Sequence, residues 1–402
     1  MTATTARMTA SRLPRSVWIL GVVSLLMDTS SELTHSLLPM LMTTTLGAGV
    51  FAVGLVEGIA EATAAVVKVA SGAVSDRWRR RKPLVVIGYG LAAVSKPAFP
   101  LATSVGAVLA ARCADRLGKG IRGAPRDALV ADVTPPHQRA TAFGLRQALD
   151  SVGAVLGPSL AIVLMGWLAG DLRLVLWWAV VPALLAVGLL VVGVEEPPTP
   201  ARAPATPRPR LTGAAALPAR LWRVVGIAVL FTLARFSEAF LVLRAASVGL
   251  PAAQVPLVMV TMSAVFAAGA YPAGVAADRL GGRGLLLGGL AVLAVADVVL
   301  ARATTPAQVL IGAAGWGLHL ALTQGLFSAL VAAAAPAALR ATAFGVYGLA
   351  TGAALLAASA LAGALWHQAG AAATFYAGAG FAFVTMLAVL ALGDARTGAA
   401  VS

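Results

Sequence analysis

The chain of 402 residues is dominated by apolar side chains, with 59% Ala, Val, Ile, Leu, Met, Phe, Trp, Tyr or Cys. Only 11% of the residues are charged, against roughly 25% in ordinary soluble domains. A soluble fold of this length needs much more polar surface, so a soluble enzyme and a disordered chain are both excluded. The composition indicates an integral membrane protein.

The charge balance adds a second exclusion. Thirty Lys and Arg against 16 Asp and Glu give a net charge of +14, which is also a feature of nucleic-acid-binding proteins. Here the basic residues are spread over many short segments between apolar runs, so no nucleic-acid partner is expected. Cys113 is the sole cysteine, so an internal disulfide is excluded. Residues 1–16 are polar and basic without a cleavage site, and we expect a retained tail there.

Twelve apolar runs are long enough to cross a bilayer as helices, which takes about 20 residues each. They cover 17–43, 50–73, 83–103, 105–128, 138–168, 172–194, 219–246, 252–277, 283–302, 305–335, 338–368 and 370–393. The predicted fold class is therefore an all-α membrane protein with twelve transmembrane helices.

The positions of Lys and Arg predict the orientation of these helices. Eighteen basic residues fall on one side, in the N-terminal tail, in 77–82, in 195–223 and in later loops, whereas Arg173 and Arg302 fall on the other. Cytoplasmic loops carry the excess of Lys and Arg. We therefore expect a multi-pass protein of a bacterial-type cytoplasmic (inner) membrane with both termini in the cytoplasm.

Two sequence matches relate the halves of the chain. Residues 139–144 and 340–345 both read RATAFG, and GAVSDR at 72–77 resembles GVAADR at 274–279. Between the halves lies a linker rich in Pro, Ala and Arg, which we expect to be extended. Repeated bundles are typical of secondary transporters, whose substrate site lies between the repeats. The predicted organisation is tail 1–16, six-helix bundle 17–194, linker 195–218, pseudo-symmetric six-helix bundle 219–393 and cytoplasmic tail 394–402.

Three motifs are similar to those of the major facilitator superfamily. Gly72–Leu84 resembles the superfamily's loop signature, with Arg79 where that signature has glycine. Arg116–Ala124 resembles a motif of the fourth helix. Gly153–Pro158 resembles the antiporter motif of the fifth helix, without its closing glycine pair.

This resemblance implies a transporter that alternates access between two bundles and exchanges its substrate for protons. It implies that the intramembrane arginine of proton coupling corresponds to Arg116. It also implies motif or gating roles at Gly72, Asp76, Arg77, Arg80, Gly153, Gly157, Pro158, Gly274, Asp278 and Arg279. The expected partners are a small-molecule substrate, protons and the lipid bilayer, with no cofactor and with the chain as a monomer.

Charged residues inside the apolar runs indicate a polar pathway. Each isolated charge at the bilayer centre costs on the order of 3 kcal/mol or more, so such residues must pair or face water. Asp28, Glu32 and His35 stand at spacings that share one helix face. Most of the charges lie in the first half, and several fall near mid-depth, so we expect one lopsided polar layer.

These charges supply the candidate site. For proton coupling we expect Asp28, Glu32, Glu61, Arg116 and Asp150, because burial of a carboxyl group favours its protonated form. For substrate contact we expect His35, Arg112, Lys119, Arg146, Arg235, Glu238, His319 and Gln324. The structural alternative is that Asp28 or Glu32 forms a buried ion pair with Arg112 or Arg116.

Other functions stay open at this point. Asp28, Glu32 and His35, with His319 opposite, are weak candidate ligands for a divalent metal, so a metal or metal-chelate exporter is an alternative. A proton-linked importer and a transport-dead sensor use the same scaffold. A membrane-embedded enzyme is disfavoured because HExxH and a GxSxG turn are absent. Aromatic residues make up only 6% of the chain, which favours a polar or charged substrate over greasy cations.

Overall fold

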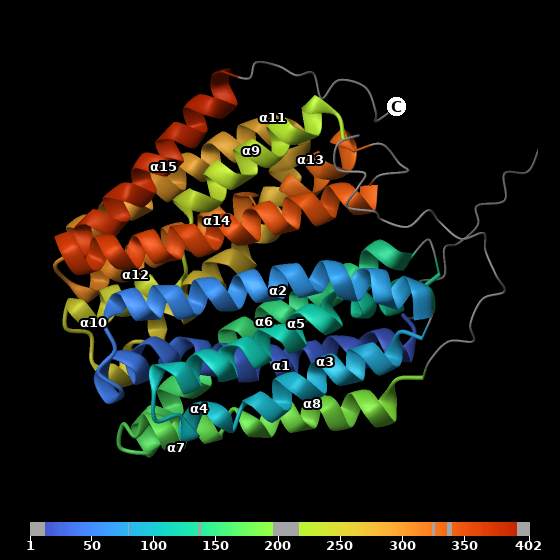
Figure 1. The fold of residues 1–402 in the computed structure, drawn as a ribbon, viewed down its shortest axis with the longest axis horizontal. Helices are drawn as coiled ribbons and strands as arrows, with labels where there is room; N and C mark the ends of the chain where they lie inside the picture. The colour runs from blue at the N-terminus through green and yellow to red at the C-terminus, as the bar shows by residue number, and fades with distance from the viewer. Residues whose placement is uncertain are drawn as a thin grey trace, which may run out of the picture.

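The computed structural model describes residues 13–78, 80–135, 138–195, 217–323, 326–335 and 340–391, and these residues contain helices and no strands. Figure 1 shows the helices in two bundles that lie side by side with their long axes roughly parallel. The predicted all-α fold class is confirmed.

The first bundle contains the helices up to residue 193. They are α1 (Arg15–Met40), extended by a π-helical turn η1 (Leu41–Thr45), α2 (Val50–Trp78), α3 (Lys82–Ser95), α4 (Ala98–Leu101), α5 (Val105–Val133), α6 (Arg139–Trp167), α7 (Leu172–Trp177) and α8 (Val180–Gly193). Pro39, Pro125 and Pro158 lie inside α1, α5 and α6. Each removes one backbone hydrogen bond from its helix.

The second bundle contains the helices from residue 219 onward. They are α9 (Ala219–Ala234), α10 (Ala239–Ser247), the 3₁₀ turn η4 (Ala252–Gln254), α11 (Leu257–Arg302), α12 (Pro306–Thr323), α13 (Leu326–Ala334), α14 (Arg340–Ala369) and α15 (Ala371–Ala391).

Helix α11 contains two of the predicted membrane crossings. Both halves of α11 pack against α12. In the first half, Met262 lies against Gly317 and Gly269 against Ala321. In the second half, Gly289 lies against Thr323 and Ala296 against Gly315. Along α12 the first half of α11 runs in the same direction and the second half runs in the opposite one. The chain therefore reverses between residues 269 and 289 and crosses twice.

Ten stretches among the described residues are long and apolar enough to span a membrane, and they include both halves of α11. Helix α5 is not among them because every 18-residue window of it carries more than two charged side chains. With α5, and with α12 and α13 as one crossing, the stretches correspond to the twelve predicted runs.

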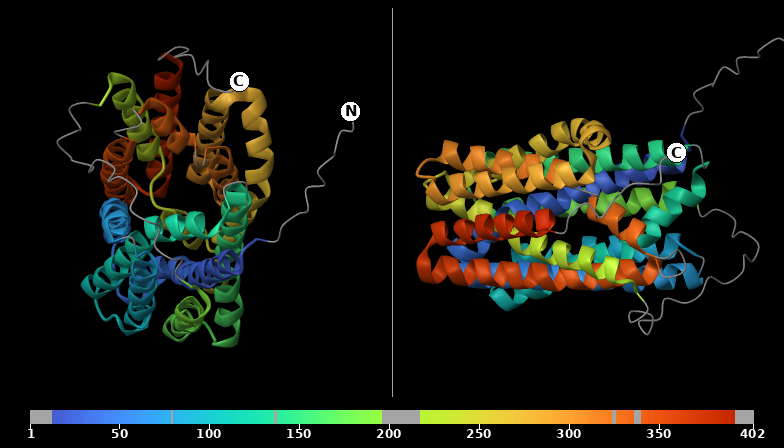
Figure 2. Two further views of the ribbon diagram at one scale, coloured as in Figure 1. Left: turned by 90° about the vertical axis from the view of Figure 1, so that its right-hand side faces the viewer. Right: turned by 90° about the horizontal axis from the view of Figure 1, so that it is seen from above.

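The two bundles meet along two pairs of helices. Helix α14 lies antiparallel to α2 over most of its length, as Figure 1 shows, with Gly363 against Phe51 and Gly352 against Ala65. On the other side of the interface α6 packs against α11, and Figure 2 shows the bundles from two further directions. Small residues at the α2–α14 contact let the two backbones approach closely.

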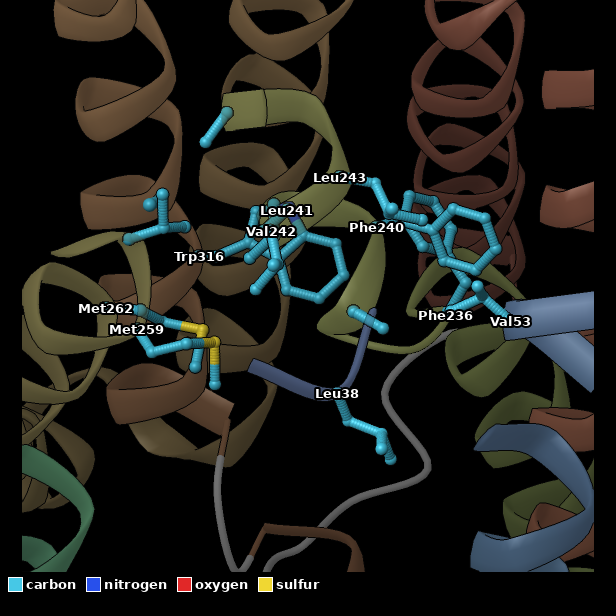
Figure 3. Close-up of a cluster of buried hydrophobic side chains, with 14 of the residues drawn as sticks. Leu38, Val53, Phe236, Phe240, Leu241, Val242, Leu243, Met259, Met262 and Trp316 are labelled. Carbon is cyan, nitrogen blue, oxygen red and sulfur yellow. The ribbon is translucent and has the colours of Figure 1, made fainter. Parts of the chain in front are cut away.

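We call the end of the molecule that carries Arg15, Arg81, Lys82, Arg220 and Arg223 the basic end. At the opposite end the bundles are held together by a cluster of buried apolar side chains, drawn in Figure 3. Its members come from both bundles and include Leu38, Val53, Phe240, Met259 and Trp316. Because this cluster excludes water, the structure is closed at that end.

Three predicted crossings are interrupted within the described residues: α3 and α4, α7 and α8, and α9 and α10 each divide one run, and the last of these breaks lies beside the cavity. The run 219–246 is a single apolar stretch in the sequence, but α9 ends at Ala234 and α10 begins at Ala239. Arg235 at the end of α9 has non-helical backbone angles (φ −119°, ψ 80°). Phe236 in this break packs against Trp316 and Phe375, with ring centroids 5.4 and 5.5 Å apart. Aromatic packing therefore stabilises the break next to the closed end.

Candidate functional site

A cavity of about 590 Å³ lies between the bundles. It is lined by α1, α2, α5 and α6 on one side and by α9, α11, α13 and α14 on the other. It reaches from Asp28 and Glu32 to Lys68 and Gln147, which are exposed toward the basic end. Asp28 is 13 residues beyond the start of α1, or about 20 Å along the helix, so the cavity ends near mid-depth.

Behind one wall of the cavity lies a fully buried ion network on α5. Asp115 is its centre: Lys96 Nζ donates to Asp115 Oδ1 at 2.8 Å, and Arg116 Nη2 lies 2.9 Å from Oδ2. Arg116 also reaches outward to Glu61, at 3.0 Å. Lys96 donates a further hydrogen bond to Ser31, at 3.0 Å. Removing one partner of a buried pair leaves an uncompensated charge, so these residues hold α1, α2 and α5 together.

A second chain of polar contacts joins this network to the cavity. Arg112 Nη2 donates to Glu57 Oε2 at 2.8 Å, and both side chains are buried. His35 lies between two glutamates, with its ring nitrogens 3.5 Å from Glu57 and 3.5 Å from Glu32. Glu32 is one-quarter exposed and lines the cavity. Glu32, His35, Glu57 and Arg112 therefore form a continuous path from cavity water to a buried arginine.

The charges nearer the basic end are paired among themselves. Arg146 Nη1 donates to Asp150 Oδ2 at 2.6 Å, and Arg146 Nε lies 3.7 Å from Asp127 Oδ1. Arg126 contacts Asp127 at 3.3 Å and donates to Ser24 Oγ at 3.0 Å. Asp150 therefore lines the cavity as a paired carboxylate, and Arg146 lies beside the cavity lining as its partner.

Asp28 is different from these residues. Its side chain is half-buried and lines the cavity, and within the described part of the chain it has no ion-pair partner within 4.0 Å. The alternative that Asp28 or Glu32 pairs with Arg112 or Arg116 is wrong here, because Arg112 pairs with Glu57 and Arg116 with Glu61 and Asp115. The charged neighbours of Asp28 are Asp150, Arg122, Lys119 and Arg126.

The opposite wall carries a group of aromatic side chains. A second lobe of about 340 Å³ adjoins the main cavity and shares Glu32, Phe231, Arg235 and Phe327 with it. The rings of Phe231 and Phe327 pack at a tilt of 55°, with their centroids 4.8 Å apart. Of the residues predicted to contact substrate, Arg235 lines both lobes and Glu238 lines the second one.

The candidate His319 lies outside the cavity in this conformation. It is fully buried, shares a 2.8 Å hydrogen bond with the Gly289 carbonyl, and stacks behind Phe231. Its Nε2 has no partner among the described atoms. The remaining substrate candidate, Gln324, lies outside the described residues.

Three of the predicted motif positions are structural contacts. An added Cβ atom on Gly153 would lie 2.7 Å from the Leu25 carbonyl oxygen, and one on Gly157 would lie 2.6 Å from that of Thr29, so both glycines let α6 approach α1. An added Cβ atom on Gly72 would lie 3.4 Å from the Cβ atom of Ala124, at the contact between α2 and α5.

The other motif residues are less informative. Pro158 lies in α6, and Arg80 is exposed between α2 and α3. Asp76 and Arg77 lie near the end of α2, and Gly274, Asp278 and Arg279 lie in α11, but their side chains are outside the described part of the structure.

The proposed metal ligands do not converge. Asp28 and His35 are seven residues apart, or about 10 Å along the axis of α1. A search of the described residues finds no group of three or more His, Cys, Asp or Glu side chains that could hold a metal ion. The divalent-metal alternative therefore receives no support from this geometry.

Several residues of the site were not predicted. Lys96, Asp115 and Glu57 form the buried network, and their only sequence signal is a charge inside an apolar run. The aromatic wall of Phe231, Phe266, Phe327 and Tyr347 has no charge pattern to mark it. Helix positions alone do not show which apolar side chains face a cavity and which face lipid.

Comparison with known proteins settles the family. The sequence profile of the Major Facilitator Superfamily matches residues 20–243. The chain is also 33% identical over 362 residues to an uncharacterized MFS-type transporter of Methanocaldococcus jannaschii, covering 88% of this chain and 89% of the relative. The chain belongs to the major facilitator superfamily.

Two further similarities are more limited. The multidrug resistance protein MdtH of Yersinia enterocolitica is 30% identical over 143 residues, which cover 36% of this chain and 35% of that protein. The crystal structure of the peptide transporter POT in complex with sulfate superposes with a TM-score of 0.79 at 16% identity, covering 95% of this chain and 94% of that one. The second similarity shows the fold alone.

Membership in the superfamily makes this chain a multi-pass membrane transporter and not an enzyme. The cavity between the bundles is the place where such a transporter holds its substrate. The cavity, its ion network and the apolar closure at one end are therefore parts of a transport pathway.

Proposed function

We propose that this transporter exports a polar or charged small molecule across the cytoplasmic membrane in exchange for protons, with both chain ends in the cytoplasm. The basic end carries most of the Lys and Arg outside the network, which supports its placement in the cytoplasm. The cavity then opens to the cytoplasm, where an export substrate enters, and the apolar cluster of Figure 3 closes the outer side.

The observation that carries the proposal is the position of Asp28. It lines the main cavity at mid-depth and, among the described carboxylates of that cavity, has no ion-pair partner within 4.0 Å; Glu238, in the adjoining second lobe, is also unpaired. A carboxylate that is already paired with arginine gains little from a proton. An unpaired one in a partly buried site exchanges a proton readily.

The proposed cycle uses this property. In the conformation open to the cytoplasm, the carboxyl group of Asp28 releases its proton to cytoplasmic water as substrate binds. The bundles then rock so that the apolar cluster separates and the α2–α14 side stays in contact. Substrate leaves on the outside, Asp28 takes a proton from the outer solution, and the protonated carrier returns.

Glu32 and His35 couple the cavity to the buried network in this scheme. His35 contacts Glu32 and Glu57, so its protonation state changes the balance of charge around Arg112. Arg112 and Arg116 hold α5 to α2. A proton on the cavity side is thereby linked to the packing of the helices that must move.

The limited similarity to MdtH, a multidrug resistance protein, supports export. Import driven by protons remains the competing direction, and the experiment must separate the two. Proteoliposomes that contain a pH dye are given an imposed pH gradient, and organic cations, organic anions, zwitterions and divalent metals are added in turn.

Antiport predicts proton movement opposite to the movement of one substrate class. The Asp28→Asn variant should lose this movement, whereas Asp132→Asn, the same change in an ion pair with Arg81 at the basic end, should keep it. Proton movement in the same direction as the substrate would favour the importer. Full activity of Asp28→Asn would overturn the assignment of Asp28.

A further inference from the structure

The cavity presents unpaired charges of both signs on its wall. Ten of the side chains that line it are charged, and the carboxylates of Glu61, Asp127 and Asp150 are neutralised by arginines. Within the described residues, four basic side chains of the lining have no ion pair within 4.0 Å: Lys68, Lys119, Arg122 and Arg235. Asp28, on the same first-bundle wall as Lys68, Lys119 and Arg122, is a carboxylate without an ion pair within 4.0 Å.

Arg122 is the most informative of these cations. It is only 4% exposed, its guanidinium lies 4.6 Å from the ring centroid of Tyr89, and its Nη1 has no hydrogen-bond partner among the described atoms. A buried guanidinium donor without an acceptor is costly unless a ligand supplies one. An acid group of a bound molecule would supply that acceptor.

Charges of opposite sign lie close together here without touching. Lys119 and Arg122 are among the charged neighbours of Asp28, yet neither approaches it within 4.0 Å. Lys119 is exposed to the cavity one turn of α5 before Arg122. A ligand with an ammonium group and an acid group would pair with both sides of this gap, whereas a ligand with one charge would leave the other side unpaired.

The facing wall determines the rest of the ligand. Phe231, Phe266, Phe327 and Tyr347 line it, and all four come from the second bundle. Aromatic faces of this kind bind an apolar or aromatic body. The volume of about 590 Å³ is within the usual range for sites of small organic molecules.

We infer that the substrate is amphoteric: a small molecule whose ammonium group pairs with Asp28, whose acid group pairs with Lys119 and Arg122, and whose apolar body packs on Phe231 and Phe327. This inference rests on the transport function proposed above and names its substrate class. It also explains the exchange, because an ammonium group and a proton compete for the same carboxylate.

Four compounds of one shape test the inference. Tryptophan carries both charges, tryptophan amide only the ammonium group, N-acetyltryptophan only the carboxylate, and N-acetyltryptophan amide neither. Their dissociation constants are measured by calorimetry on the purified full-length transporter in detergent. Tryptophan should bind about tenfold more tightly than each singly charged compound, which corresponds to about 1.4 kcal/mol.

Variants assign each charge. Asp28→Asn should abolish the preference for tryptophan over N-acetyltryptophan and keep its preference over the amide. Lys119→Gln should do the reverse. Arg15→Gln, which removes an exposed charge at the start of α1, should change neither preference.

The inference is overturned if the four compounds bind equally, if none binds, or if a singly charged compound binds as tightly as tryptophan. Its failure is separable from that of the proposed function. Proteoliposomes with proton movement driven by a singly charged compound would refute the amphoteric class and keep the exchange. Selective tryptophan binding without any proton movement would keep the amphoteric class and refute the exchange.

Discussion

Glu32 lines the cavity and contacts His35, the next residue of the polar path that leads to Glu57 and Arg112. Its contact to His35 is long, at 3.5 Å, and it forms no bond to an arginine among the described residues. Glu32→Gln should therefore fold and bind substrate normally, because no buried positive charge loses its partner. Substrate-driven proton movement should fall about tenfold or more, equivalent to about 1.4 kcal/mol.

Glu195→Gln, at an exposed position after α8, is the matched control. Unchanged proton movement in Glu32→Gln would mean that the path from Glu32 through His35 to Glu57 takes no part in proton coupling.

Asp297 is a buried acid that the transport scheme does not use. Trp316 Nε1 donates to Asp297 Oδ1 at 2.8 Å, and Oδ2 has no partner among the described atoms. Trp316→Phe keeps most of the aromatic packing but leaves the carboxyl group without its donor. We expect a loss of about 1–3 kcal/mol in stability, measured as a lower melting temperature in detergent. Trp366→Phe changes the same aromatic cluster at a residue whose ring contacts are apolar within the described structure, and it should lower the melting temperature less. Equal losses would mean that packing, and not the hydrogen bond, holds this region.

At the scale of elements, the contact of α6 with α1 limits side-chain size. A Cβ atom on Gly157 would lie 2.6 Å from the Thr29 oxygen and 2.8 Å from the Leu33 nitrogen, which are backbone atoms that cannot rotate away. Gly157→Ala should therefore separate the helices and cost about 1–3 kcal/mol. Gly166→Ala, also on α6 but with nothing within 4 Å, should be neutral or slightly stabilising. Thermal unfolding of the two variants decides this, and equal melting temperatures would contradict the close packing.

The sequence predicted the crossings well because membrane helices leave a strong hydropathy signal. The breaks inside single runs were not predicted, and the seventh run shows the reason. Arg235, Ser237 and Glu238 stand in an otherwise apolar run, and the break after Ala234 involves the packing of Phe236 on Trp316 and Phe375, which are distant in the sequence. Residues in contact only through the fold leave no mark on local periodicity.

The site could be predicted only in part, because contacts between residues that are distant in the sequence leave no local signal. Charges in apolar runs led directly to Asp28, Glu32, Glu61 and Arg116, which lie around the cavity wall. Which carboxylate pairs with which arginine depends on how α2, α5 and α6 are placed. Arg112 could therefore be assigned to Glu57, and Asp28 recognised as unpaired, only from the structure.

At the scale of the whole molecule, the two ends differ: a charged cavity reaches the basic end, and an apolar cluster closes the other end. Alternating access requires that the two ends exchange these roles. Thr351 lines the cavity on α14, and Val53 is buried in the apolar cluster on α2. The accessibility of Thr351 therefore reports whether the cavity is open, and that of Val53 reports whether the apolar cluster is open.

The measurement that tests this most directly is cysteine labelling in cells and in inside-out vesicles with a maleimide that does not cross membranes. Thr351→Cys and Val53→Cys are made separately, each combined with Cys113→Ser, which removes the natural thiol. We predict that Thr351→Cys is labelled from the cytoplasmic side. Val53→Cys should be labelled from the outside, and only while the transporter is cycling. Labelling of Thr351→Cys from the outside alone, or a Val53→Cys thiol that stays protected during transport, would contradict the account.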